Sequence, residues 1–409
     1  MRTCVRTARR LLRHAFRFLP GWVQLRVADR YLKHKLPRLG ARRCPDALTL
    51  FVTSRCNARC AHCFYWRELN AGTNELRLDE LERIAASLRD GLGSLALTGG
   101  EPVLRQELAD IARIFNRMST TRVIGIATNG LLPERTLETC QRILDECSLE
   151  KLSVQVSLDG MQGTHDAIRG VPGAFEKAMR TISLLAALQL KHPILTVSTA
   201  LAIQPRNYGE IAELVDHLVP MGVSLKFLVI RGSRYGVFGL NPEISSDFDP
   251  KEDESASLSH DVEQLAALYV SLQELQARRP EAFWSELEQA KMHTTLRILT
   301  EQRRVLPCHA GRLEGVVYPD GSVAVCELTR PFADLREYDL DFERLWNSPA
   351  AAAMRAQTRS CACIHGCNLV TALQFHPAIA SAAITGRSLS NRRQRWQWPV
   401  SGASRGEGA

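Results

Sequence analysis

The sequence predicts an α/β protein, and two patterns along the chain carry that prediction. From residue 48 onward, short β-branched or apolar runs alternate with amphipathic segments of helical length. Polar signatures follow the ends of several of these runs. Strands that alternate with helices form parallel βα units with right-handed crossovers, so the chain forms either a partial barrel or a doubly wound sheet. In both architectures the chemistry lies at the carboxyl ends of the strands.

The individual elements follow from the same patterns. Six apolar runs are the predicted strands, at residues 48–54, 94–100, 123–130, 151–160, 194–203 and 223–232. The predicted helices between them lie at residues 78–91, 105–118, 134–147, 173–190 and 207–219. Residues 241–263 are acidic and rich in serine, which predicts a linker or mobile lid. Residues 264–302 have a helical pattern, with a break or a new start at Pro280.

Composition and charge narrow the class of protein. The chain has 409 residues, 45% of them hydrophobic, and no uninterrupted apolar stretch long enough for a membrane span. The formal net charge of +8 is concentrated in residues 1–47, which carry thirteen Lys or Arg against two Asp. The rest of the chain is therefore slightly acidic, and we expect no specific nucleic-acid partner.

The basic start of the chain has three interpretations. Residues 6–36 mix arginine with leucine, phenylalanine, tryptophan and valine at roughly helical intervals, broken at Pro20 and Gly21. This pattern resembles basic helices that rest on anionic membrane surfaces, so peripheral membrane contact through residues 1–40 is one interpretation. The others are a helix packed on the body and an organelle transit peptide. No apolar signal-peptide core precedes a cleavage-like site, so we expect a cytoplasmic protein, with membrane association depending on this segment.

The twelve cysteines are clustered, which favours metal ligation over a disulfide framework. The first group is Cys56, Cys60 and Cys63, and the second is Cys308, Cys326, Cys361, Cys363 and Cys367. The four cysteines that stand apart are interpreted as small buried residues or free thiols: Cys4, Cys44, Cys140 and Cys147.

The first group supplies only three thiols. A 4Fe-4S cubane needs four thiolates for full coordination by protein, so three would leave one iron open. An open iron is useful only if something else binds it, which predicts a small-molecule chelator. The alternative is a zinc knuckle completed by His62 or by a distant ligand.

Two signatures together carry a family resemblance. The spacing C-x3-C-x2-C directly after the first strand, and "LTGGEP" at residues 97–102, resemble the cluster loop and the glycine-glycine-glutamate turn of radical S-adenosylmethionine (SAM) enzymes. The resemblance covers roughly residues 48–232 and implies a partial (β/α)6 TIM-type barrel. In that family SAM chelates the open iron through its amino and carboxylate groups, and one electron from the cluster cleaves it to a 5'-deoxyadenosyl radical.

The resemblance also implies SAM-binding residues in this chain. His62, before the third cysteine, occupies a position near the adenine. The turn Gly99, Gly100, Glu101 and Pro102 would hold the methionine ammonium, with close backbone approach at the glycines and a charge-assisted bond from the carboxylate. Residues after the third and fourth strands resemble positions that contact ribose or carboxylate, with plain turn residues as the alternative: Thr128, Asn129, Ser157 and Asp159.

The second cysteine group resembles the auxiliary-cluster extension of the same family, called SPASM with two clusters and twitch with one. Cys308 and Cys326 stand in a C-x12-G-x4-C pattern around "YPDGSVAV", which predicts a β-hairpin with an Asp-Gly turn. The full form usually needs seven cysteines. Five imply one fully ligated 4Fe-4S cluster, held by Cys308, Cys326 and two of Cys361, Cys363 and Cys367. A second, incompletely ligated cluster and structural zinc are the alternatives.

We therefore predict a chain in five parts. A basic amphipathic segment (1–47) precedes the radical SAM core (48–235), an acidic linker with helices (236–304) and a small cysteine-rich α+β module of the SPASM or twitch type (305–386), before a basic flexible tail (387–409). No catalytic acid or base stands out. Tyr235, Arg231 and His309 are pocket candidates, although a surface or packing role is the favoured interpretation of each.

The predicted activity is reductive cleavage of SAM and hydrogen abstraction from a small molecule, lipid or peptide. The auxiliary cluster would take up the remaining electron, giving oxidation or a crosslink, and a flavodoxin or ferredoxin would supply electrons. One alternative is a peptide or protein maturase that acts with a separate recognition partner. A non-catalytic iron-sulfur or zinc-binding protein is the other, although such a protein has no use for the glycine-glycine-glutamate turn.

Overall fold

The computed structural model describes residues 19–40, 43–72, 74–119, 121–232, 235–247, 260–278 and 285–385. Several predictions lie wholly or partly outside the described residues. These are the first eighteen residues of the basic segment, with Cys4, residues 248–259 of the acidic linker, the break at Pro280 and the basic tail (387–409).

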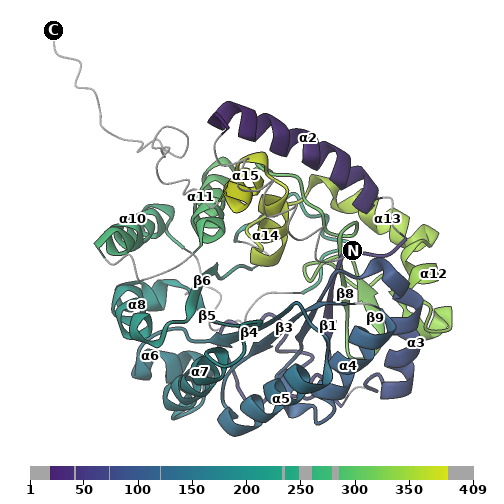
Figure 1. Cartoon of the computed structure of the whole chain (residues 1–409), viewed down its shortest axis with the longest axis horizontal. Helices are drawn as coiled ribbons and strands as arrows, with labels where there is room; N and C mark the ends of the chain where they lie inside the picture. The colour runs from purple at the N-terminus through teal and green to yellow at the C-terminus, as the bar shows by residue number, and fades with distance from the viewer. Residues whose placement is uncertain are drawn as a thin grey trace.

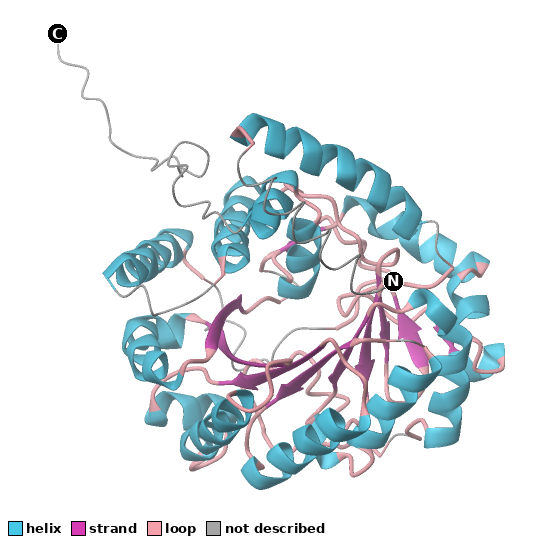
Figure 2. Cartoon of the chain, in the orientation of Figure 1, coloured by secondary structure: helices cyan, strands magenta, loops and turns pink. Residues whose placement is uncertain are grey.

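The six predicted strands are all present and form a parallel sheet, as Figure 2 shows. They are β1 (Ala47–Phe51), β2 (Ser94–Thr98), β3 (Val123–Thr128), β4 (Lys151–Ser157), β5 (Leu195–Ile203) and β6 (Ser224–Val229). Each pairs with the next in sequence order, so consecutive strands are neighbours in space. The sheet curves like part of a barrel, and its two edges are β6 and β10 (Ala333–Asp334).

Helices cover one side of the sheet (Figure 1). The predicted ones are α3 (Leu78–Leu88), α4 (Leu108–Met118), α5 (Pro133–Glu146), α7 (Ala174–Gln189) and α8 (Ile211–Leu218). Alternate strand residues such as Leu97, Ile126 and Val154 are buried, as the two-residue period of a strand requires. The sequence analysis missed α6 (Gln162–Arg169), which is too short to show a clear helical period.

The C-terminal hairpin belongs to the same sheet. The predicted hairpin is confirmed as β8 (Glu314–Val317) and β9 (Ser322–Ala324), with Gly321 at φ +93° in the turn. β8 runs parallel to β1, and the resulting nine-stranded sheet has the order β10-β9-β8-β1-β2-β3-β4-β5-β6. The cysteine-rich module is therefore continuous with the core through backbone hydrogen bonds.

The remaining helices lie mainly on the other side of the sheet or at its ends (Figure 1). They are α2 (Gly21–Gly40), α10 (Val262–Arg278), α11 (Glu286–Glu301), α12 (Phe342–Trp346), α13 (Pro349–Gln357), α14 (Gly366–Gln374) and α15 (Pro377–Thr385). Two short strands, β7 (Val237–Phe238) and β11 (Ala362–Cys363), pair antiparallel. Within the described ranges, no helix is long and apolar enough to cross a membrane.

Helix α11 covers the β6 edge of the sheet. The backbone N–H of Phe227 in β6 donates to Glu288 Oε2 of α11 at 3.1 Å. The same oxygen pairs with Lys291 at 2.5 Å, and both side chains are almost fully buried. An edge N–H without a partner would be costly here, so this contact closes the sheet on that side.

We predict that Glu288→Ala lowers the free energy of unfolding by about 3–5 kcal/mol, because it leaves a buried Lys291 ammonium and an edge N–H without their partner. Glu301 is the last residue of the same helix, where it is more exposed than Glu288, and it pairs with Arg297 at 2.9 Å. Glu301→Ala is therefore the matched control and should cost about 0–1 kcal/mol. Chemical denaturation measures both, and equal losses would contradict this account of the edge.

Candidate functional site

The loop after β1 holds the three clustered thiols in a fixed backbone frame. The Asn70 amide clamps Cys56, accepting from its N–H at 3.1 Å and donating to its C=O at 3.3 Å. The N–H of Ala58 donates to Cys56 Sγ at 3.4 Å, and the N–H of Cys63 donates to the Cys60 carbonyl at 3.2 Å. The loop therefore presents its thiols from an ordered turn.

The thiols are partly buried, and this sets their protonation. Burial raises the pKa of the Cys56 thiol to about 11 and that of Cys63 to about 12. The charges of neighbouring thiols in the group raise both of these pKa values further. Thiols held protonated in this way lose their protons when a cationic metal centre binds them. In the described part of the chain, no three potential ligands converge closely enough to hold a single metal ion.

Helix α6 braces the cysteine loop and brings an arginine to it. The N–H groups of Arg59 and Ala61 donate to the carbonyls of Arg169 and Ile168, both at 2.9 Å. The Arg169 guanidinium donates to Cys60 Sγ at 3.5 Å and pairs with Asp159 at 2.7 Å. Arg169 was not predicted as a site residue, and it lies in the stretch "HDAIRGVPGAFEKA" at residues 165–178.

The glycine turn after β2 packs directly on the cysteine loop. A Cβ at Gly99 would lie 2.4 Å from the Thr53 carbonyl oxygen, and one at Gly100 would lie 2.3 Å from that of Arg55. Gly99 also has φ +139°, which favours glycine. The Gly100 N–H donates to the Thr53 carbonyl at 2.9 Å, and the Glu101 N–H donates to the Arg55 carbonyl at 2.8 Å. The close approach that these glycines permit is thus to the chain's own loop.

Glu101 gathers the ends of β2 and β3. Its buried carboxylate accepts from the N–H of Val103 at 3.1 Å, the hydroxyl of Thr128 at 2.8 Å and the N–H of Asn129 at 2.7 Å. Burial raises the pKa of Glu101 to about 6, although these three donors favour its ionised form. Pro102 begins the short turn that follows. Three of the predicted SAM-binding residues, Glu101, Thr128 and Asn129, are therefore in direct contact.

Asparagine side chains then connect this cluster to the cysteine loop. Asn129 Nδ2 donates to Asn57 Oδ1 at 2.8 Å, and Asn57 follows Cys56 in the chain. Neither Asn57 nor Asn70 was predicted to matter. The only signal for Asn57 was its place beside Cys56, and Asn70, seven residues after Cys63, had no such signal.

Asp159 is fully buried beyond the end of β4. Burial alone would raise its pKa, but the Arg169 guanidinium and the nearby His62 hold it below its ordinary value. Its backbone N–H donates to His165 Nδ1 at 3.0 Å. Ser157, the last residue of β4, is half-buried. The structure therefore places His62 and Asp159 close together, and gives the Asp159 carboxylate a protein partner that the sequence did not reveal.

Four of the five C-terminal cysteines form a second group. Cys308, Cys326 and Cys363 influence one another electrostatically, and Cys361 is hydrogen-bonded to Cys363. A small cavity is lined by Cys308, Cys361 and Cys363 together with Arg304 and Asn368, among others. Asn368 Nδ2 donates to Cys326 Sγ at 3.3 Å. Burial raises the pKa of Cys308 to about 11 and is also the largest effect raising that of Cys326.

Cys367 is separate from this group. The residue is exposed as a whole, although its thiol points inward and burial raises the thiol's pKa to about 12. The charged groups that act on this thiol are Glu327, Glu314, Arg231 and Lys291. The local fold explains the separation. Cys363 belongs to strand β11, whereas Cys367 lies in the first turn of α14. The sequence left open which two of Cys361, Cys363 and Cys367 would join Cys308 and Cys326 as ligands. The structure brings Cys361 and Cys363 to Cys308 and Cys326.

A chain of polar contacts connects the two cysteine groups. Arg231, after β6, pairs with Glu327 at 3.2 Å, and His365 Nε2 lies 2.7 Å from the same carboxylate oxygen. Glu327 follows Cys326, and the Arg231 guanidinium lies 5.2 Å from the centre of the ring of Phe64, which follows Cys63. Burial alone would raise the pKa of Glu327, but His365 and Arg231 lower it to about 2. We call Arg231, Glu327 and His365 the bridge.

Two other pocket candidates lie elsewhere. Tyr235 packs on His260 with ring centroids 5.0 Å apart, and His309 packs edge-on against Phe375 at 5.3 Å. Of the three pocket candidates, only Arg231 joins the contacts between the cysteine groups. Glu327 and His365 were missed, and their signal was adjacency to the C-terminal cysteines.

The partial parallel barrel, the cysteine loop and the glycine turn packed against it together define a radical SAM domain. Residues 50–218 match the family model described as the Radical SAM superfamily, so this part of the chain is similar to that family. The predicted fold class is confirmed as well.

Curated relatives share this domain. An AdoMet-dependent heme synthase of Methanosarcina barkeri is 33% identical over 193 residues, which is 46% of this chain and 52% of that protein. The sporulation killing factor maturation protein SkfB of Bacillus subtilis is 28% identical over 185 residues, 44% of this chain and 40% of that protein. The chain spans about half the length of the curated relatives it matches.

Solved structures share the fold over more of the chain. SuiB of Streptococcus suis has a TM-score of 0.53 at 16% identity, covering 80% of this chain and 71% of that one. A structure of anSMEcpe with bound AdoMet has a TM-score of 0.54 at 16% identity, covering 84% of this chain and 99% of that one. At 16% identity, the similarity to these two structures shows a shared fold and no more.

We predict that Gly100→Ala disrupts the cysteine loop, because its Cβ would lie 2.3 Å from a backbone oxygen. The variant should unfold at a lower temperature and bind less iron on anaerobic reconstitution. Gly163→Ala in α6 is the matched control, since its Cβ would meet nothing within 4 Å. This control should be neutral or stabilising by about 0.5–1 kcal/mol. Equal behaviour of the two variants would show that the contact with Arg55 is unimportant.

Proposed function

We propose that this protein is a radical SAM enzyme that oxidises or crosslinks its substrate with the help of one auxiliary 4Fe-4S cluster. The observation that carries the proposal is the backbone pairing of the glycine turn with the cysteine loop, next to a second group of four thiols. When bound, the N-terminal cluster and SAM supply a 5'-deoxyadenosyl radical that abstracts a hydrogen atom from the substrate.

The residues of the first site fit such a cluster and cofactor. Three thiols from one loop, Cys56, Cys60 and Cys63, suit a cubane that keeps one iron for SAM. The N–H groups of Arg169 and Ala58 already point to two of their sulfur atoms, as they would to cluster thiolates. We assign SAM contacts as the resemblance implies, to His62, Gly99, Gly100, Glu101, Pro102, Thr128, Asn129, Ser157 and Asp159.

Glu101 is the residue in this set with the clearest physical role. Its carboxylate is oriented by three donors, so it can receive an ammonium group without reorganising. A buried carboxylate near neutrality gains from a cationic partner, since the partner offsets the desolvation that raises its pKa. These properties support its assignment to the methionine ammonium of SAM.

The second site fits a fully ligated cluster. Cys361 and Cys363 are two residues apart in an extended segment, so they can point to the same side. Cys308 and Cys326 complete a set of four, which leaves Cys367 as the spare thiol. A cluster with four protein ligands has no open iron, so its role would be electron transfer. The bridge would hold this site in a fixed relation to the first.

The substrate is proposed as a small molecule, a lipid or a peptide. A second candidate function is maturation of a peptide or protein side chain together with a separate recognition partner. Two similarities favour it: SkfB is named as a maturation protein, and anSMEcpe has been solved with a bound Cp18Cys peptide. A flavodoxin or ferredoxin is proposed as the electron donor.

We expect the reduced, reconstituted protein to convert SAM to 5'-deoxyadenosine, measured by liquid chromatography. Cys60→Ala should abolish this product, because it removes a thiolate from the SAM-binding cluster. Cys147→Ala is the matched control, since Cys147 lies apart from both thiol groups at the end of α5. If the wild type forms no more 5'-deoxyadenosine than Cys60→Ala does, the protein is better explained as a non-catalytic iron-sulfur or zinc protein.

The auxiliary assignment predicts a difference between two neighbouring cysteines. Cys363→Ala should lose the iron and the visible absorbance of the second cluster, whereas Cys367→Ala should retain both. Iron and sulfide analysis of variants in a Cys56→Ala, Cys60→Ala, Cys63→Ala background isolates that cluster. If the analysis finds zinc in place of iron, the second site holds a structural metal and not an auxiliary cluster. If Cys367→Ala loses iron and Cys363→Ala does not, the ligand assignment is reversed.

A further inference from the structure

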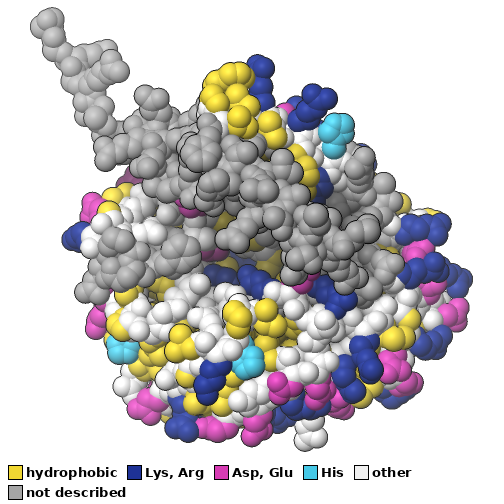
Figure 3. Space-filling model, in the orientation of Figure 1, with side chains coloured by type: hydrophobic (Ala, Val, Ile, Leu, Met, Phe, Trp, Pro, Cys, Tyr) yellow, Lys and Arg dark blue, Asp and Glu magenta, His cyan; other side chains and the backbone are white. Residues whose placement is uncertain are grey.

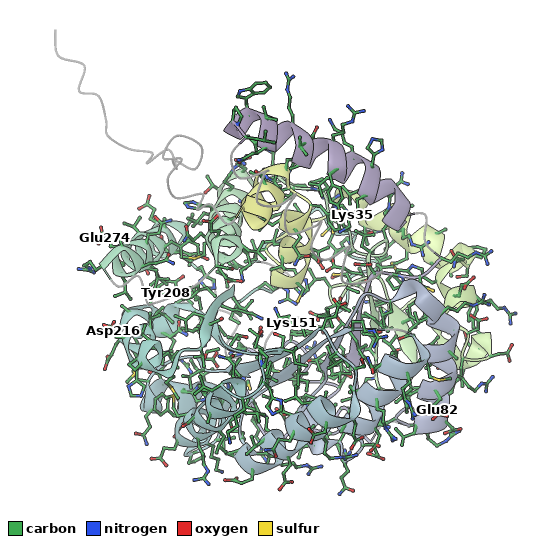
Figure 4. The ribbon with its side chains drawn as sticks, in the orientation of Figure 1. Lys35, Glu82, Lys151, Tyr208, Asp216 and Glu274 are labelled. Carbon is green, nitrogen blue, oxygen red and sulfur yellow. The ribbon has the colours of Figure 1, made fainter. Side chains whose placement is uncertain are left out.

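Helix α2 lies across the outside of the molecule (Figure 1). Its inner stripe, formed by Gln24, Ala28 and Leu32, is buried at the four-residue spacing of a helix face, and the helix packs against α15. Lys35 lies on the inner side of the helix in Figure 4, with its ammonium 5.7 Å from the centre of the Phe375 ring. One side of α2 is thus fixed to the body, and the opposite side faces solvent.

The outward side of α2 is basic. Arg26, Arg30 and Lys33 recur at intervals of three or four residues and are all exposed, so they form one ridge along the helix. The single carboxylate among the described side chains of α2, that of Asp29, pairs with Lys33 at 2.6 Å, which leaves Arg26 and Arg30 as further basic groups on the ridge. Figure 3 shows basic and hydrophobic side chains side by side over this helix.

The same helix concentrates the exposed apolar surface of the molecule. The described residues include seven large hydrophobic side chains that are exposed, and four of them are in α2 or directly before it. Trp22 is 65% exposed, Tyr31 54% and Val27 46%, and Leu19 precedes the helix. The Arg26 guanidinium lies 5.7 Å from the centre of the Trp22 ring. The Tyr31 ring lies 5.8 Å from the Lys35 ammonium and so flanks the inner side, whereas Trp22 lies beside the basic ridge. An exposed ring next to arginine needs a partner that accepts both charge and apolar surface.

We propose that α2 docks the protein on an anionic lipid surface. The basic ridge would face the lipid headgroups, and Trp22, one turn before Arg26, would lie at the level where amphipathic rings are favoured. The helix would lie flat, because its inner stripe is already occupied by the body of the protein. This docking surface goes beyond the proposed radical chemistry and stands without it.

Two other occupants fit the surface less well. A nucleic acid would pair with the arginines but would leave the aliphatic side chains of Val27 and Leu19 in water. A second copy of the chain, docked symmetrically, would place one basic ridge against another. Anionic lipid satisfies both features of the helix with one partner.

Vesicle sedimentation of the full-length protein tests the proposal. We expect binding to phosphatidylcholine vesicles that contain phosphatidylglycerol, and little binding to phosphatidylcholine alone. The triple variant Arg26→Glu, Arg30→Glu, Lys33→Glu should bind anionic vesicles more weakly by about tenfold or more. The matched control Arg117→Glu, Lys177→Glu, Lys191→Glu reverses three exposed charges outside α2 and should bind as the wild type does.

Tryptophan fluorescence gives a second, local measurement. Anionic vesicles should shift the emission of the wild type to shorter wavelength, and Trp22→Phe should remove that shift while circular dichroism shows an unchanged fold. Equal vesicle binding by the α2 triple variant and its control would overturn the proposal. So would α2-dependent binding of a DNA duplex without lipid binding, or α2-dependent dimerisation without lipid binding.

Discussion

The arrangement of the first site depends on one backbone contact, the packing of the glycine turn after β2 on the loop after β1. With no side chain at Gly99 or Gly100, the two segments exchange hydrogen bonds directly, N–H of Gly100 to Thr53 and N–H of Glu101 to Arg55. This contact fixes the backbone position of Glu101. The position of its carboxylate, which accepts hydrogen bonds from Thr128 and Asn129, is fixed with it. The thiol loop and the acidic residue are set by the same pair of parallel strands, so neither can shift without the other.

Burial without a charged partner is the second property that shapes the site. Cys56, Cys63 and Glu101 all have raised pKa values because they are removed from water. The two thiols are therefore held neutral until a cation binds, whereas Glu101 is mostly ionised at neutral pH but is destabilised by its burial. Asp159 is different, since Arg169 already supplies its positive charge. The site therefore contains one compensated charge pair and a set of groups whose charged forms a cationic ligand would stabilise, which is the pattern that a metal cluster and a sulfonium amino acid would complete.

Sequence patterns were sufficient for the strands and the thiols but not for the contacts between distant segments. The strands could be predicted because runs of β-branched and apolar residues alternate with segments of helical periodicity. The hairpin could be predicted because an Asp-Gly turn has a local sequence signature. The parallel pairing of β8 with β1 joins residues more than two hundred positions apart and leaves no local trace. The same holds for Arg169, which reaches Cys60 across 109 residues. Cys367 could not be separated from Cys363 by spacing alone, because the distinction depends on where strand β11 gives way to helix α14.

The pairing of β8 with β1 also determines how the two cysteine groups are related. Cys326 lies two residues after the end of β9, in a sheet whose β1 strand leads into the loop that carries Cys56, so hydrogen-bonded strands join the two groups on one side. On the other side, Arg231 from the end of β6 contacts both Phe64 and Glu327. Two independent connections of this kind make the spacing between the groups a property of the folded sheet. An electron passing between the sites would therefore meet a fixed path.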